Sequence, residues 1–248
     1  MASPWQDNVR TLALAGSCTA FVATPNLGAL IGKGEQTRQY DTVITPPDYA
    51  FAVWAPIFAG CALSTIGQCL PSGRSNPVSR RTGWPLAGAY AVNTAWSLAA
   101  QNGRFAATPF LLAVATAFTA TAHLRLQRTG RPARWTSVTP ASTGLLLGWT
   151  ALASVVNIAG SAVAAGAGKT APRTVNASAA GLLGASAALA YSVTASRRGG
   201  PWLAVASGWG LLTTAITSGK PPRVRTAAGA GAAAIALALA HSRRQSRP

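Results

Sequence analysis

Acidic residues are almost absent from this sequence. Its 248 residues include four Asp and Glu side chains against 21 Lys and Arg, which gives a formal net charge of +17. The last acid is Asp48, and no carboxylate side chain follows it. A soluble domain usually mixes both signs of charge over its surface. The shortage argues against a soluble fold, and it leaves the later apolar segments without an acid that binds a cation or relays a proton.

Cysteine is also scarce, and its spacing excludes two common uses. Cys18, Cys61 and Cys69 all fall inside apolar stretches, and no C-x-x-C pair occurs. An odd number of cysteines in this arrangement predicts neither a disulfide framework nor a zinc site. We interpret all three as small packing residues, and we expect no metal and no other cofactor.

The basic residues stand in short clusters at the ends of apolar stretches. A charge of +17 would suggest a nucleic-acid partner if it followed one polar face. Clusters at segment ends are instead typical of membrane proteins that meet anionic lipid headgroups. These clusters therefore predict anionic lipids as partners. A hydrophobic small molecule is a further expected partner on separate grounds, namely the candidate binding residues and the motifs described below, and a homodimer is an option. Nucleic acid is not an expected partner.

Apolar residues make up 49% of the chain and gather in long runs. About 20 are needed to cross a bilayer as a helix. Eight segments approach this length, at 10–30, 48–70, 84–101, 105–124, 140–165, 175–196, 201–218 and 226–241. The last is marginal because it is rich in Ala and Gly, so seven or eight spans are predicted. The expected fold class is an all-α, polytopic helical bundle, because helices satisfy their own backbone hydrogen bonds in lipid.

The loops between these segments predict an orientation. With eight spans, most Lys and Arg lie on the side that holds both termini. The positive-inside rule then places the basic loops and both termini in the cytoplasm. We expect an integral protein of a bacterial cell membrane.

Six side chains within the spans are candidates for ligand binding, because three are indoles, two are amides and one is small. They are Trp54, Asn93, Trp96, Trp149, Ala153 and Asn157. Helical spacing puts the two from the third span on one face and the three from the fifth on another. They could line a common cavity. Alternatively, the amides join neighbouring helices and the tryptophans anchor helix ends, and spacing alone favours this second interpretation.

Four motifs in sequence order resemble a known family. Residues 45–54 read TPPDYAFAVW and are similar to the signature TPxGYxFxIW. Residues 26–28 and 34–37 resemble the end of the first helix and the long loop after it. Residues 93–96 match NxxW, and residues 148–157 match GWxxxAxxxN. Over residues 10–165 the chain thus resembles the tryptophan-rich sensory proteins, relatives of the translocator protein or peripheral benzodiazepine receptor (TspO/MBR).

The resemblance implies a five-helix bundle whose ligand cavity is closed by the loop after the first helix. Members bind porphyrins, and some bind sterols or other flat apolar ligands. It implies a translocator-like domain at 1–165 with a lid at about 32–47, and additional helices with a basic tail at 166–248. Trp54, Asn93, Trp96, Trp149 and Ala153 would line the pocket, and Asn157 completes the last motif. The implied function is binding of a porphyrin-like, sterol or isoprenoid ligand for sensing or transfer.

An intramembrane enzyme is the alternative function. Glu35, Asp41 and Asp48 lie together in the lid and at the mouth of the second span, and Asp48 replaces the Gly of the family signature. An acid whose pKa is raised by burial could protonate an isoprenoid and start a cyclisation. Porphyrin breakdown assisted by the pocket tryptophans is a second enzymatic route. The plainer interpretation is that these acids only solvate the loop.

Overall fold

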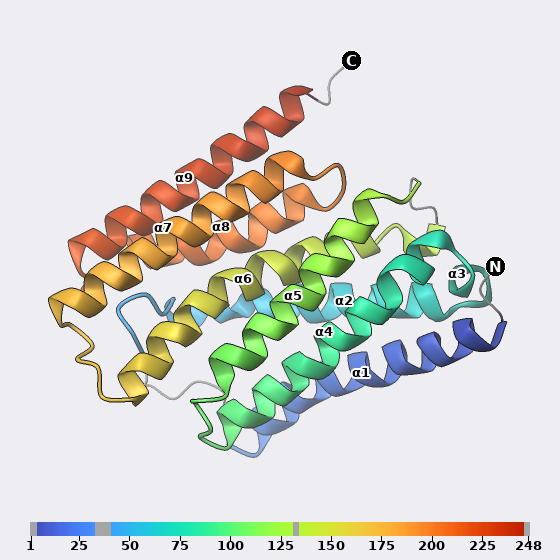
Figure 1. The fold of residues 1–248 in the computed structure, drawn as a ribbon, viewed down its shortest axis with the longest axis horizontal. Helices are drawn as coiled ribbons and strands as arrows, with labels where there is room; N and C mark the ends of the chain where they lie inside the picture. The colour runs from blue at the N-terminus through green and yellow to red at the C-terminus, as the bar shows by residue number, and fades with distance from the viewer. Residues whose placement is uncertain (1–3, 33–40, 131–133, 246–248) are drawn as a thin grey trace. The chain divides into compact units, whose positions relative to one another are not determined.

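The computed structural model describes residues 4–32, 41–130 and 134–245 (Figure 1). Within these ranges all the regular secondary structure is helical. This confirms the all-α fold class. The longer helices are α1 (Pro4–Leu30), α2 (Trp54–Cys69), α4 (Pro77–Gln101), α5 (Thr108–Gln127), α6 (Thr139–Ala164), α7 (Pro172–Ala195), α8 (Gly200–Ile216) and α9 (Pro222–Gln245). Shorter ones are α3 (Pro71–Arg74) and the 3-10 helices η2 (Asp48–Val53) and η3 (Arg134–Thr136).

Each of the eight predicted segments overlaps one of the long helices. Six helical segments in the described residues are long and apolar enough to cross a membrane: α1, η2 with α2, α5, α6, α7 and α9. The group includes α9, so its Ala and Gly content does not shorten it. The two long helices outside the group are α4 and α8, and α8 has only 17 residues. The chain is an integral membrane protein with a helical bundle.

Proline and glycine mark the helix ends as the sequence predicts. Proline occupies one of the first two positions in each of α3, α4, α5, α7 and α8. Its missing backbone N–H is not needed there, because the first N–H groups of a helix have no partner within the helix. The turn before α8 ends with Gly199 at φ +78°, a conformation that glycine adopts without a steric penalty.

The helix that carries the third predicted span begins two turns before that span. The segment was expected to begin at Trp84, but α4 begins at Pro77. Asn76 caps it, because the Asn76 side chain accepts a hydrogen bond of 2.8 Å from the Val78 backbone N–H. Arg80 and Arg81 therefore lie on the helix, since arginine has good helix propensity and does not end it.

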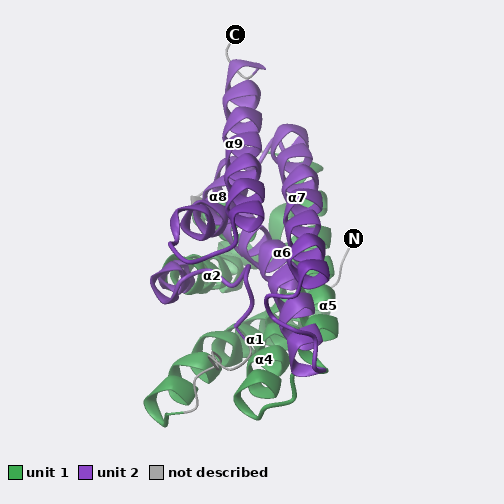
Figure 2. Cartoon of the chain, turned by 90° about the vertical axis from the view of Figure 1, so that its left-hand side faces the viewer, with its two compact units in different colours: residues 1–36, 55–143 green, residues 37–54, 144–248 purple. Residues whose placement is uncertain are grey.

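The chain divides into two compact units (Figure 2). Unit 1 comprises residues 1–36 and 55–143, and unit 2 comprises residues 37–54 and 144–248. In unit 1, α1 packs against α4 and α4 against α5. In unit 2, α7, α8 and α9 pack against one another, and η2 contacts α8. The predicted family domain at 1–165 stays a prediction.

Small residues allow close helix contact in unit 2. A Cβ atom at Gly144 would collide with the Gly199 carbonyl, and one at Gly148 with the Leu203 carbonyl. The G-x-x-x-G pair of α6 thus faces the first turns of α8 with backbone nearly in contact. Such approach is the usual role of this motif between membrane helices.

Candidate ligand-binding site

Two of the predicted pocket residues meet in unit 2. The rings of Trp54 and Trp149 lie edge to face, with centroids 6.2 Å apart and planes at 80°. Phe51 meets the same Trp149 ring at 5.6 Å and 86°. This edge-to-face geometry is the favoured one for aromatic pairs. Trp149 is only 2% exposed, whereas Trp54 is half-buried.

Helix α8 packs beside this aromatic cluster. The Trp209 ring lies edge to face with Tyr49 at 6.2 Å, and its Nε1–H donates a 2.8 Å hydrogen bond to the Ala50 carbonyl. A Cβ atom at Gly210 would crowd the Trp149 ring. The family-like segment 45–54 is therefore held in unit 2 by a helix beyond residue 165. Trp209 could not be predicted from the sequence as part of this contact, because nothing local in α8 indicates which distant segment it touches.

Ala153 and Asn157 continue along α6 from Trp149. The Asn157 Nδ2–H donates a 3.0 Å hydrogen bond to the Ala153 carbonyl, one turn earlier on the same helix. Both residues are half-buried. In this arrangement at least one amide hydrogen of Asn157 is used within α6.

The other two predicted residues lie on α4 in unit 1. Asn93 is 1% exposed, and its Nδ2–H donates a 2.9 Å hydrogen bond to the Ala89 carbonyl. Its Oδ1 is buried and has no hydrogen-bond partner among the described residues. Trp96, three positions later, is half-buried. Asn93 thus keeps a buried acceptor whose hydrogen-bonding capacity α4 does not use.

The six predicted residues are thus divided between the two units: four belong to unit 2, and Asn93 and Trp96 belong to unit 1. Their assignment to one ligand pocket stays a prediction. In the described residues, no group of three or more His, Cys, Asp or Glu side chains is placed to hold a metal ion.

The described end of the predicted lid is firmly packed in unit 2. Thr42 and Thr45 close a turn through a 3.2 Å hydrogen bond from the Thr45 N–H to the Thr42 carbonyl, and Val43 and Ile44 are buried. The Lys220 Nζ donates to the carbonyls of Val43 at 3.1 Å and Thr45 at 2.7 Å. Burial lowers the pKa of Lys220 below its ordinary value, and the charge of Asp41 partly opposes this.

The three acids of the enzymatic alternative have different settings. Glu35 lies outside the described residues. Asp48 is exposed at the first position of η2. Asp41 is half-buried and lies close enough to Lys220 for its charge to raise the pKa of that lysine. Neither described acid is placed as a buried proton donor.

A family model described as TSPO-like protein matches residues 12–241, which includes all or part of every long helix from α1 to α9. No curated protein and no solved structure matches the chain.

Proposed function

The chain belongs to the family of TSPO-like proteins, and we propose that it binds a flat, apolar ligand within the membrane for sensing or transfer. A tetrapyrrole is the ligand class that we favour over a sterol or an isoprenoid. Support comes from the family membership, from the indoles at Trp54 and Trp96, and from one polar atom in the interior of unit 1.

The observation that carries this proposal is the buried Oδ1 of Asn93. The side-chain atom of Asn93 that faces the Ala89 carbonyl must be the donor nitrogen Nδ2. The remaining polar atom of the side chain is therefore the acceptor oxygen Oδ1. A buried acceptor without a partner costs about 1–3 kcal/mol, and such groups in native proteins call for an explanation. A tetrapyrrole carries pyrrole N–H and carboxylic O–H donors that would satisfy this oxygen.

The tryptophans suit the flat part of such a ligand. Trp54 and Trp96 are half-buried, so each indole has a surface that protein atoms do not cover. Offset stacking or edge contact with a planar ring uses such surfaces. Trp149 contributes indirectly, because its edge-to-face contact holds the Trp54 ring in place.

The proposal is tested by titrating the detergent-purified protein with protoporphyrin IX. Binding is measured as quenching of the tryptophan fluorescence. Asn93→Leu should raise the Kd about 10-fold, because loss of one hydrogen bond in a dry site costs about 1 kcal/mol or more. The same variant should unfold at an equal or higher temperature, because it removes a buried oxygen that lacks a partner.

Thr94→Val is the matched control, because the Thr94 hydroxyl donates only to the Tyr90 carbonyl of its own helix. Its Kd should stay within about twofold of the wild-type value. An unchanged Kd in Asn93→Leu would remove Asn93 from the site. Mass analysis of the recovered ligand, in darkness and in light, separates binding from the enzymatic alternative, since an enzyme would return an altered porphyrin or isoprenoid.

A further inference from the structure

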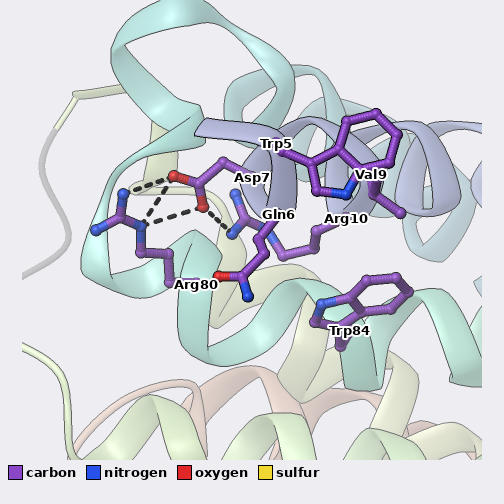
Figure 3. Close-up of a pocket in the computed structure, with 7 residues that line it drawn as sticks. All are labelled: Trp5, Gln6, Asp7, Val9, Arg10, Arg80 and Trp84. Atoms are coloured by element: carbon purple, nitrogen blue, oxygen red, sulfur yellow. Dashed lines mark hydrogen bonds and ion pairs between the residues drawn. The ribbon is translucent and has the colours of Figure 1, made fainter. Parts of the chain in front are cut away.

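A surface pocket lies in unit 1 between the first turns of α1 and the early turns of α4 (Figure 3). Its volume is about 440 Å³, within the range of small-molecule sites. The lining residues combine two indoles, a carboxylate and two guanidinium groups, and they are Trp5, Gln6, Asp7, Val9, Arg10, Arg80 and Trp84. The pocket is separate from the six predicted ligand residues, and the proposal below does not depend on the proposed function.

A buried carboxylate organises one wall of this pocket. Asp7 is almost fully buried, and Arg80 binds it from α4 with three contacts: Nε lies 3.1 Å from both oxygens, and Nη2 lies 2.6 Å from Oδ2. Arg10 Nη1 lies 2.5 Å from Oδ1. Arg10 is itself buried, and its Nη2 donates to the Arg74 carbonyl. Both guanidinium groups are therefore held in fixed positions before any ligand arrives.

The wall has an excess of positive charge. Two guanidinium groups share one carboxylate, and Asp7 is the only Asp or Glu among the described residues of unit 1. The Nη1 of Arg80 has no hydrogen-bond partner among those residues, and the side chain is 37% exposed. A guanidinium edge of this kind pairs well with phosphate oxygens. The wall therefore favours an anionic ligand. A cationic ligand is disfavoured because Asp7 already forms ion pairs with Arg10 and Arg80.

The other walls are apolar and reach the surface. Trp5 is 73% exposed and Trp84 is 50% exposed. Figure 3 shows both indoles on one side of the ion pairs, one from each helix. Trp5 lies in the first turn of α1, a helix long and apolar enough to cross a membrane, and tryptophan is enriched at the boundary between lipid headgroups and acyl chains. A small soluble anion would leave the two indole surfaces exposed to water, whereas the apolar part of a lipid would cover them.

We propose that this pocket binds the headgroup of an anionic phospholipid. The phosphate lies against the free edge of Arg80, and the glycerol and first acyl carbons lie between Trp5 and Trp84. Asp7 does not touch the lipid but orients Arg80 and Arg10, so it is a positioning residue. The two ion pairs of the buried Asp7 distinguish this site from general attraction between basic loops and a charged bilayer.

Native mass spectrometry of the full chain in detergent tests the proposal, with phosphatidylglycerol and phosphatidylcholine of identical acyl chains as probes. The protein should retain phosphatidylglycerol in preference to phosphatidylcholine. Arg80→Gln should weaken phosphatidylglycerol retention about 10-fold, because a charge-assisted hydrogen bond is lost, and Arg80→Lys should recover part of it because the charge remains.

Arg81→Gln is the matched control. Arg81 is exposed on the same turn and donates to the Arg128 carbonyl, outside the pocket, so retention should stay within about twofold. Equal losses in Arg80→Gln and Arg81→Gln would overturn the proposal, because they would indicate diffuse charge attraction. Equal retention of both lipids would also overturn it.

Two further measurements distinguish the source of the phosphate and protect against misfolding. Competition by glycerol 3-phosphate at the same concentration as the lipid would assign the pocket to a soluble phosphate compound and overturn the lipid assignment. Trp84→Ala removes one apolar wall and leaves the ion pairs intact, so it should weaken phosphatidylglycerol retention even if Arg80→Gln fails to fold. Unchanged retention in a folded Trp84→Ala variant would count against the proposal.

Discussion

At the scale of single residues, Trp149 and Asn93 occupy different kinds of position although both belong to family-like motifs. Trp149 is 2% exposed and packs against Phe51, Trp54 and the backbone of α8 at Gly210. Its ring is part of the core of unit 2. Asn93 is also buried, at 1% exposed, but its Oδ1 has no hydrogen-bond partner in the described part of the chain. Loss of binding is therefore easier to interpret at Asn93 than at Trp149.

Trp149→Ala should destabilise unit 2 by about 3–5 kcal/mol, because it leaves a cavity where a buried indole was packed. Thermal unfolding in detergent, followed by circular dichroism, measures the shift. Trp96→Ala is the control, since Trp96 is half-buried and its truncation should cost less. Equal unfolding temperatures for Trp149→Ala and the wild type would show that the Trp149 contacts with η2 and α8 do not contribute to stability.

At the scale of elements, the segment that enters α2 depends on helices far along the chain. Trp209 on α8 bonds the Ala50 carbonyl, and Lys220, just before α9, bonds the carbonyls of Val43 and Thr45. These contacts involve main-chain carbonyls, so they restrain the path of residues 42–54 whatever side chains it carries. The C-terminal helices therefore support the described end of the predicted lid and the signature segment.

Lys220→Met should loosen this segment while α8 and α9 stay helical, because two hydrogen bonds to its backbone are lost and the apolar stem is kept. Hydrogen–deuterium exchange followed by mass spectrometry should show faster exchange in peptides covering residues 41–54. The matched control is Lys169→Met, since Lys169 is an exposed lysine of the same unit. Exchange that is equally slow in the wild type and Lys220→Met would exclude this role for Lys220.

At the scale of the whole molecule, membrane topology is the main property still to be measured. Six helical segments meet the length and composition of a membrane span, and α4 and α8 are the long helices that do not. Six and eight spans both place the two termini on one side. Whether α4 crosses the membrane decides between these topologies, because it determines on which side of the membrane each later loop lies.

We expect α4 to span, so Ser75 and Asn102, on either side of it, should be labelled from opposite faces of the membrane. Each would be changed to cysteine in a variant without Cys18, Cys61 and Cys69, and treated with an impermeant maleimide in intact cells. Both positions are exposed in the structure. Asn102→Cys should react from outside and Ser75→Cys only after permeabilisation, because the basic loop is expected in the cytoplasm. Reaction of both from one side would refute the eight-span topology.

Much of the helical framework could be predicted without coordinates, because it depends on local features. Segment length, apolar composition and the prolines and glycines at helix ends are read from neighbouring residues, and the motifs around Trp54, Asn93 and Trp149 identified the family. One helix boundary differs where a local signal is ambiguous. Arg80 and Arg81 suggested a loop, whereas the cap at Asn76 starts α4 earlier.

The pairing of distant residues required coordinates, since no periodicity encodes it. Asp7 and Arg80, which form an ion pair, are 73 positions apart in the sequence. Trp209 and Ala50, which share a hydrogen bond, are 159 positions apart. Composition indicates that a basic chain with long apolar helices belongs in a membrane. Packing selects which of many similar arginines and tryptophans meet a carboxylate, an indole or a carbonyl, because burial leaves each polar group only the partners that the neighbouring helices bring within reach.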